Sequence, residues 1–355
     1  MRVGLALALA LFGTLLHVAA AGRHLAGKVN MQSSMRSLVG SKEPWVEPVS
    51  WKPRAFVFHN FMTEEEADHI VGLAKPFMKR STVVDAGGQS VEDQIRTSYG
   101  TFLKRLQDPV VAAVEQRLAT WTQLNVSHQE DMQILRYGIG QKYGAHYDSL
   151  DNDSPRVATV LLYLSDCEGG GETAFPGVGA REWGSQWIDD SVRQRFEPFS
   201  ACASGHVAAK PKKGDALLFF SLKPDGVNDQ YSLHTGCPVI SGVKWTATKW
   251  IHTKPFRPNL LGNDPPEAVV YPEECKDSHT ECASWAEAGT AAPECLHDLV
   301  AWECEKNAQF MRGDAFSLGN CRAACGDCEM CGSDDIACKS RNRVRAGYLS
   351  MEEIM

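Results

Sequence analysis

The spacing of apolar residues predicts two helices in the first third of the chain. Residues 63–78 begin with Thr63 and Glu66, the two positions of a capping box, and continue with apolar residues at helical spacing. Residues 108–124 place Pro109 in a first turn, and an apolar stripe with residues three and four apart follows. Both segments are typical of amphipathic helices that support a larger core.

Between residues 132 and 256 the apolar positions form short runs separated by Gly, Pro, Asp and Asn. The runs cover residues 133–140, 145–150, 157–166, 206–211, 215–222 and 244–253. Short strands at this spacing predict a β-sandwich or barrel, so we expect a mainly β protein with flanking helices, of the α+β class. The polar stretch 80–98 is long for a connection, and we expect a loop that covers a site.

Composition and charge narrow the range of partners. With 355 residues, 43% of them hydrophobic, the chain has room for one large domain and one small one. The net charge is −8 and no block of Lys and Arg occurs in the sequence. Both features argue against a nucleic-acid partner or an anionic membrane surface, which would need clustered basic residues.

The N-terminus and the cysteines point to the secretory pathway. Residues 1–21 predict a signal peptide, or a signal anchor if they are not cleaved, and residues 22–45 a linker. We therefore expect membrane association only through the N-terminal segment. Nine cysteines lie between residues 275 and 338, which indicates disulfides formed in the lumen of the endoplasmic reticulum or Golgi. Asn125 and Asn152 are N-glycosylation sequons.

Histidine and acidic residues two apart are the first candidates for chemistry. Such pairs are His128 with Glu130, His146 with Asp148, and His279 with Glu281. For each pair alone, the ordinary interpretation is a solvated or hydrogen-bonded side chain. His146 and Asp148 lie in a predicted strand, where both point to one face. With His234, which follows the apolar run 215–222, they would supply the two His and one carboxylate of a non-haem Fe(II) oxygenase.

Lys244, ten residues after His234, extends this hypothesis. An oxygenase that uses 2-oxoglutarate must neutralise the far carboxylate of this cosubstrate in a dry pocket, so a nearby Lys or Arg is expected. The period of two in residues 244–253 gives one strand face a polar and aromatic character. That face carries Lys244, Thr246, Thr248, Trp250 and His252, and the other carries Trp245, Ala247 and Ile251.

Five stretches carry a resemblance to a known family: "RSTVVD...RTSYGTFL", "ILRYGIGQKYGAHYD", "RVATVLLYLSDCEGGGETAFP", "KKGDALLFF" and "LHTGCPVISGVKWTATKWIH". In this order, across residues 46–256, they resemble the prolyl 4-hydroxylases of plants and algae. The resemblance implies a double-stranded β-helix, or jelly roll, with Fe(II) bound by His146, Asp148 and His234. It also implies 2-oxoglutarate held by Lys244, Tyr137 and Thr173.

The same resemblance implies the remaining site residues and cofactors. The catalytic residues would be Arg156, Trp250 and His252, and the substrate groove would include Tyr143 and Arg96. Besides Fe(II) and 2-oxoglutarate, the reaction would use O₂ and ascorbate. The 80–98 loop would close over a Pro-rich polypeptide in the polyproline II conformation, whose rings suit aromatic-lined grooves. The loop at 148–156 is shorter than the resemblance leads us to expect.

The C-terminal part forms a separate, cysteine-rich segment after the Pro-rich linker 257–274. Residues 275–328 resemble an ShK-toxin-like module, which implies the pairs Cys275–Cys328, Cys282–Cys321 and Cys304–Cys325. The sequence alone leaves other pairings open. Cys295, Cys331 and Cys338 are additional, and a zinc site is the rival interpretation of "CRAACGDCEMC". Residues 329–355 are a tail.

These observations favour a prolyl 4-hydroxylase that acts on Pro-rich secreted or cell-wall glycoproteins. Two alternatives remain open from the sequence. The same machinery could hydroxylate another residue, such as lysine. The oxygenase fold could instead be inactive, in a binding protein whose cysteine-rich module does the work, although the intact set of His146, Asp148, His234 and Lys244 speaks against this.

Overall fold

The structure is a computed structural model that describes residues 42–84, 90–91, 94–149, 153–177, 184–257, 270–287, 302–313 and 318–355. The predicted signal segment, most of the linker 22–45, Asn152 and Cys295 lie outside the described residues. The chain divides into two compact units, residues 1–45 and 46–355, and the second holds the predicted oxygenase domain and the cysteine-rich segment. None of the helices in the described ranges is both long and apolar enough to cross a bilayer.

Two antiparallel sheets build the predicted oxygenase domain. In the described part of the chain, the larger has the order β12-β1-β2-β14-β9-β17-β7-β6-β3 and the smaller β13-β11-β15-β8. The strands of the larger sheet are β1 (Trp45–Lys52), β2 (Arg54–His59), β3 (Lys79–Arg80), β6 (Tyr99–Leu103), β7 (Met132–Tyr137), β9 (Arg156–Tyr163), β12 (Gln186–Trp187), β14 (Ala216–Phe220) and β17 (Lys244–His252). The smaller sheet contains β8 (Tyr143–His146), β11 (Thr173–Phe175), β13 (Val207–Ala209) and β15 (His234–Gly236).

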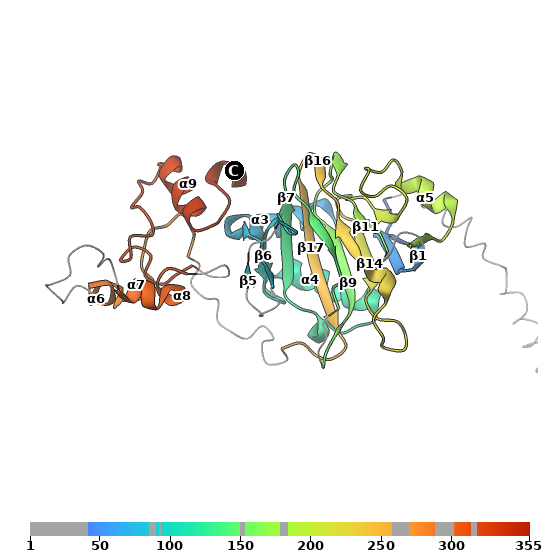
Figure 1. Cartoon of the computed structure of the whole chain (residues 1–355), viewed down its shortest axis with the longest axis horizontal. Coiled ribbons are helices and arrows are strands. Elements are labelled where there is room, and N and C mark those ends of the chain that lie inside the picture. Colours follow the sequence, from blue (N-terminus) through green and yellow to red (C-terminus); the bar gives the residue numbers. More distant parts are fainter. Residues whose placement is uncertain are drawn as a thin grey trace, which may run out of the picture. The chain divides into compact units, whose positions relative to one another are not determined.

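The chain passes repeatedly from one sheet to the other. It runs from β7 in the larger sheet to β8 in the smaller, returns to β9, enters β11 and β13, and then alternates through β14, β15 and β17. Figure 1 shows β7, β17 and β9 side by side at the centre of the larger sheet. This alternation is the double-stranded β-helix, so the predicted fold class is confirmed.

Both predicted helices are present, and they cover one face of the larger sheet. They are α3 (Glu64–Ala74) and α4 (Pro109–Thr122). The capping box at Thr63 and Glu66 forms as the sequence predicts. Buried residues of both helices, such as Ile70 and Val114, join one core cluster with residues of the sheet. The opposite face of the sheet packs on the smaller sheet, and the candidate site lies between the two.

Two further pairs of short strands complete the oxygenase domain in the described ranges. They are β4 (Val83–Val84) with β5 (Ser90–Val91), and β10 (Gly169–Gly170) with β16 (Val239–Ser241). The first pair lies within the stretch 80–98, where the sequence predicts a loop. A short helix, α5 (Asp190–Phe196), follows β12. Its buried residues Val192 and Phe196 pack in a second core cluster.

The cysteine-rich segment contains short helices held by disulfides. The helices are α6 (Cys282–Glu287), α7 (Trp302–Lys306) and α8 (Ala308–Met311), followed in the tail by α9 (Ile336–Arg345) and α10 (Met351–Ile354). The disulfides are Cys275–Cys328, Cys282–Cys321, Cys304–Cys325, Cys331–Cys338 and, in the oxygenase domain, Cys202–Cys237. The first three are the pairs that the resemblance implies. Every cysteine of "CRAACGDCEMC" is in a disulfide, which leaves no thiolate there for zinc.

Candidate active site

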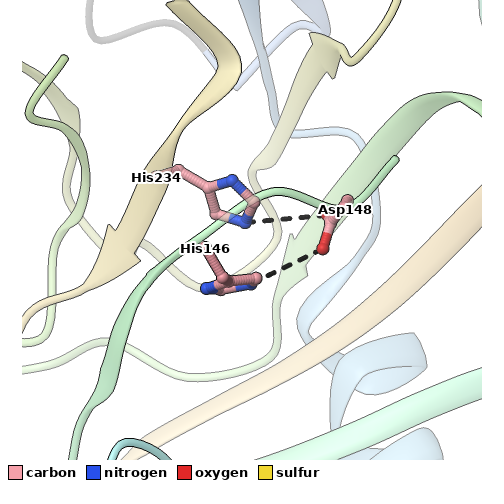
Figure 2. Close-up of side chains that lie close together, drawn as sticks. All are labelled: His146, Asp148 and His234. Atoms are coloured by element: carbon pink, nitrogen blue, oxygen red, sulfur yellow. Dashed lines mark ion pairs between the residues drawn. The ribbon is translucent and has the colours of Figure 1, made fainter. Parts of the chain in front are cut away.

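Two histidines on neighbouring strands of the smaller sheet face each other. His146 ends β8 and His234 begins β15, and the two are register partners. Asp148 lies two residues beyond His146, and its two carboxylate oxygens are 3.5 Å from His146 Nε2 and 3.6 Å from His234 Nε2. One ligand atom from each residue lies within 4.8 Å of the others. Figure 2 shows the three side chains pointing toward one another.

Backbone carbonyls fix the orientation of both rings. His146 Nδ1 lies 2.8 Å from the carbonyl oxygen of Gly144, and His234 Nδ1 lies 2.9 Å from that of Ser232. A carbonyl oxygen accepts a hydrogen bond only from a protonated ring nitrogen, so Nδ1 carries the proton of each neutral ring. Nε2 then keeps its lone pair for a metal. The hydroxyl of Thr159 donates to Asp148 Oδ2 at 2.7 Å and holds this carboxylate in place.

The ionisation of the triad suits metal binding. Burial and the neighbouring His146 lower the pKa of His234 to about 4, although Asp148 opposes this shift. Burial alone would raise the pKa of Asp148, but the histidines and the Thr159 hydroxyl hold it well below its usual range. At neutral pH His234 is therefore neutral and Asp148 is ionised. These are the protonation states that Fe(II) ligands require.

The triad opens into a pocket that also contains the predicted cosubstrate residues. Tyr137, Thr173 and Lys244 all line it. Burial lowers the pKa of Lys244 to about 8 and raises that of Tyr137 to about 12. Among the described residues, no carboxylate lies within ion-pairing distance of the Lys244 ammonium. A buried cation without a counter-ion is costly, so this pocket fits an anionic ligand such as 2-oxoglutarate.

Unpaired polar atoms give a second indication of a ligand. Thr246 Oγ1, Trp250 Nε1 and Arg96 Nε are buried and have no hydrogen-bond partner among the residues that the structure describes. All three residues line the pocket. Buried polar groups are nearly always paired, so these atoms are suited to contact bound groups. The residues present thus fit a metal with an anionic cosubstrate.

The predicted groove residues Arg96 and Tyr143 lie together at this pocket. The Arg96 guanidinium lies 4.7 Å from the centre of the Tyr143 ring and donates to Gln133 Oε1 at 2.9 Å. The Tyr143 ring stacks on His146 with 3.7 Å between ring centres. Arg96 therefore connects the stretch 80–98 to the triad through one aromatic ring.

Arg156 and His252 do not line the pocket, unlike Trp250. Both bind the carboxylate of Glu130, Arg156 Nε at 2.6 Å and His252 Nε2 at 2.8 Å. The Arg156 guanidinium lies 3.8 Å from the centre of the Trp250 ring. The register shift between β17 and β9 at this point arises on β9, where Val157 lies without a partner between Ala158 and Arg156. Arg156 and His252 therefore meet at Glu130 and not in the pocket, and their catalytic roles stay a prediction.

Glu130 is the functional neighbour that the sequence reasoning missed. Its only signal was the pair with His128, one of three similar pairs. His128 itself binds the carbonyl oxygen of His252 through Nδ1 at 3.0 Å. His279 stacks on Trp285 in the cysteine-rich segment, with 4.6 Å between ring centres. Neither His128 nor His279 joins the triad.

Asn125, the sequon inside the described residues, is exposed. Its side chain accepts a hydrogen bond from the amide of Ser127 at 2.9 Å. The other sequon, Asn152, lies outside the described part of the chain. Glycosylation at both positions stays a prediction.

Known proteins resemble this chain over most of its length. Residues 132–252 match the family model of the 2OG-Fe(II) oxygenase superfamily. "Probable prolyl 4-hydroxylase 4" of Arabidopsis thaliana is 42% identical over 313 residues, which cover 84% of this chain and 95% of that protein. Prolyl 4-hydroxylase 2 of the same plant is 41% identical over 323 residues, 89% of this chain and 98% of that protein.

Among solved structures, the viral collagen prolyl hydroxylase of Paramecium bursaria Chlorella virus 1, in complex with 2-oxoglutarate, is 25% identical. It aligns with a TM-score of 0.41 and covers 56% of this chain and 96% of that chain. The residues matched by the family model, 132–252, include the triad and Lys244. With about 40% identity over nearly the full length of the plant relatives, the chain belongs to the prolyl 4-hydroxylase family of Fe(II)/2-oxoglutarate oxygenases.

Proposed function

We propose that this protein converts peptidyl-proline to 4-hydroxyproline in Pro-rich secreted or cell-wall polypeptides. One observation carries the proposal: a single pocket combines the candidate metal ligands with a buried lysine that has no carboxylate partner in the described residues. The names of the plant relatives support proline as the target residue.

Six residues of the pocket have a specific task in this proposal. His146, Asp148 and His234 bind Fe(II), and Lys244 pairs with the far carboxylate of 2-oxoglutarate. Tyr137 and Thr173 contribute hydroxyls to the same carboxylate. When bound, iron with 2-oxoglutarate and O₂ supplies the oxidant that places one oxygen atom in the proline C4–H bond, while the other leaves in succinate and CO₂ is released. Ascorbate keeps the iron ferrous between turnovers.

The aromatic side of the pocket suits a Pro-rich peptide. Tyr143 and Trp250 offer ring faces on which a proline ring can pack, and a polyproline II segment presents such rings at regular intervals. Arg96 supplies guanidinium donors next to Tyr143. Arg156, which is fixed on Glu130, holds Trp250 from behind. Arg156 and His252 then act as positioning residues.

Five disulfides within the described residues support residence in an oxidising compartment. We place the protein in the lumen of the endoplasmic reticulum or Golgi, with any membrane association through residues 1–21. The module at residues 275–328 is, in this proposal, of the ShK-toxin-like type.

The test uses the purified full chain with Fe(II), 2-oxoglutarate and ascorbate. Poly-proline, an extensin-type peptide and an arabinogalactan-type peptide serve as substrates. Matched peptides with every proline replaced by alanine, and a lysine-rich peptide, are the controls. We expect a mass increase of one oxygen atom, located on proline by fragmentation, together with an equal amount of succinate. Oxygen on lysine, or no peptide oxidation in an iron-loaded protein, would overturn the proposal.

A further inference from the structure

The C-terminal strap, which we define as residues 346–355, extends the larger sheet at β3. The amide of Arg80 donates to the carbonyl of Gly347 at 3.0 Å, and the amide of Leu349 donates to that of Met78 at 3.0 Å. Tyr348 forms an antiparallel bridge with Lys79. The strap thus pairs with the strand that ends the order of the sheet.

Side chains fix the strap in this position. Leu349 is fully buried and belongs to the same core cluster as α3 and α4. Arg343, at the end of α9, is also fully buried. Its guanidinium donates to the carbonyls of Leu349 at 2.6 Å and Pro76 at 2.8 Å, and it pairs with Glu273 at 2.6 Å. A buried arginine with all these partners cannot leave without a large loss of hydrogen bonding.

The strand that the strap covers leads directly to the substrate side of the pocket. The Arg80 side chain donates to the carbonyl of Thr97. The amide of Ser81 donates to the carbonyl of Ser98 at 2.9 Å, and their hydroxyls are also 2.9 Å apart. Thr97 and Ser98 follow Arg96, the buried side chain that rests on the Tyr143 ring.

We propose that Tyr348 and Leu349 are positioning residues for Arg96, and that the strap thereby sets the affinity for the peptide substrate. The inference rests on the proposed function for its kinetic consequence. The physical basis is a contiguous set of contacts: the strap holds β3, β3 holds residues 97–98, and these hold Arg96 against Tyr143. Such a connection needs a direct coupling test.

A purely structural role of the strap predicts a different result. If Leu349 only filled the core, its loss would lower thermal stability and the amount of active enzyme, and would leave the KM values alone. A positioning role raises the KM for peptide much more than the KM for 2-oxoglutarate, because Lys244 and Thr173 lie on β17 and β11, away from β3, and Tyr137 alone contacts Ser98. The split between the two KM values separates the roles.

The experiment uses full-chain variants. Leu349→Asp breaks the buried anchor, and Val344→Asp makes the same chemical change at an exposed position of α9. We expect Leu349→Asp to raise the peptide KM by about tenfold, with iron binding and peptide-independent succinate formation unchanged, since a lost indirect contact acts on this scale. Val344→Asp should match the wild type.

A second variant covers the case in which Leu349→Asp does not fold. Arg80→Met removes the contact with Thr97 but leaves the buried end of the strap intact, and it should raise the peptide KM in the same direction. Unchanged peptide KM in the folded variants, or a parallel rise in the KM for 2-oxoglutarate, would overturn the inference.

Hydrogen exchange makes the inference testable without any substrate. Amides of residues 94–98 should exchange faster in Leu349→Asp than in Val344→Asp, while those of β17 stay protected. If the wild type hydroxylated no peptide, the proposed function would fail, and this exchange would still decide whether the strap holds the Arg96 segment. Equal exchange at 94–98 in both variants would contradict the coupling.

Discussion

Each residue of the triad would supply one of three protein ligands in the proposed site, and the structure supports the histidines and the aspartate in different ways. Both histidines rest on backbone carbonyls, whereas Asp148 depends on one side chain, Thr159. Strand periodicity predicts that His146 and Asp148 share a face. It cannot predict Thr159, because its contact depends on how β9 lies against the loop after β8.

Replacing any of His146, Asp148 or His234 by alanine should abolish Fe(II) binding and turnover without unfolding the chain. Thr159→Val should weaken iron binding by about 10–100-fold, because it removes only a partner of a ligand. Iron titration measures the loss of Fe(II) binding, and circular dichroism shows that the chain stays folded. His128→Ala is the matched control and should keep nearly full turnover. Substantial iron-dependent activity in a triad variant would show that the ligand set is wrong.

Lys244 should determine the affinity for 2-oxoglutarate. Lys244→Ala removes the partner of a desolvated carboxylate, which costs about 3–5 kcal/mol, or a factor of hundreds or more in KM. Lys244→Arg keeps the charge, and its KM for 2-oxoglutarate should lie between those of the wild type and Lys244→Ala, since the planar guanidinium fits an ammonium-sized space poorly. Iron affinity should stay the same in both variants. An unchanged KM for 2-oxoglutarate in Lys244→Ala would refute the cosubstrate site.

At the scale of single elements, β17 shows where sequence reasoning succeeds and where it stops. Its alternation correctly places Lys244 and Trp250 on the pocket face. The same alternation predicts His252 on that face, but His252 lies at the end of the strand, where it binds Glu130 and does not line the pocket. The opposite face holds Lys249, whose ammonium pairs with Glu115 of α4 at 2.6 Å. The alternation of β17 alone does not predict a buried lysine at that position, because its partner Glu115 lies on α4.

The end of β2 carries a second cluster of charges, centred on His59. Its ring contacts Asp215 at 2.7 Å and Glu47 at 3.1 Å, and Arg195 of α5 also binds Glu47. Burial lowers the pKa of His59, but the two carboxylates outweigh burial and raise it above 6.5. The folded state therefore favours the imidazolium. This contribution to stability is complete below pH 6.5 and is lost as the pH rises through the higher folded pKa.

His59→Gln should flatten this dependence of stability on pH. The glutamine keeps a polar side chain of similar size but does not titrate. We expect the melting temperature of the wild type to fall as the pH rises above about 6.5, and that of the variant to fall less. Thermal melts across a pH series measure the difference. Parallel curves for the two proteins would mean that the cluster makes no pH-linked contribution.

At the scale of the whole molecule, the sequence predicts the order of segments better than their contacts. Period and turn residues mark the oxygenase domain, and cysteine spacing marks the module. The strap carries no such signal, because its ten residues mix apolar and polar side chains without a helical or strand period. Leu349 acquires its role only through pairing with Met78, more than half the chain away.

A chain that ends near Pro265 should still fold and convert 2-oxoglutarate to succinate, since the triad and Lys244 lie upstream. Its melting temperature should be lower than that of the full chain, because Leu349 no longer fills the core. Calorimetry and succinate assays test both points. In the intact protein, a reducing agent should melt the cysteine-rich segment before the oxygenase domain. Loss of folding on truncation would show that the C-terminal part is integral to the fold.

The two buried faces of β17 also limit the insertions and deletions that this strand can tolerate. A one-residue insertion between Thr246 and Ala247 would turn every later side chain to the opposite face. Trp250 would then point at the helices, and Lys249 would enter the pocket and leave Glu115 unpaired. A substitution in β17 changes one side chain, whereas an insertion moves every later side chain of the strand and so damages both the site and the core. Insertions and deletions should therefore be confined to the loops on either side of this strand.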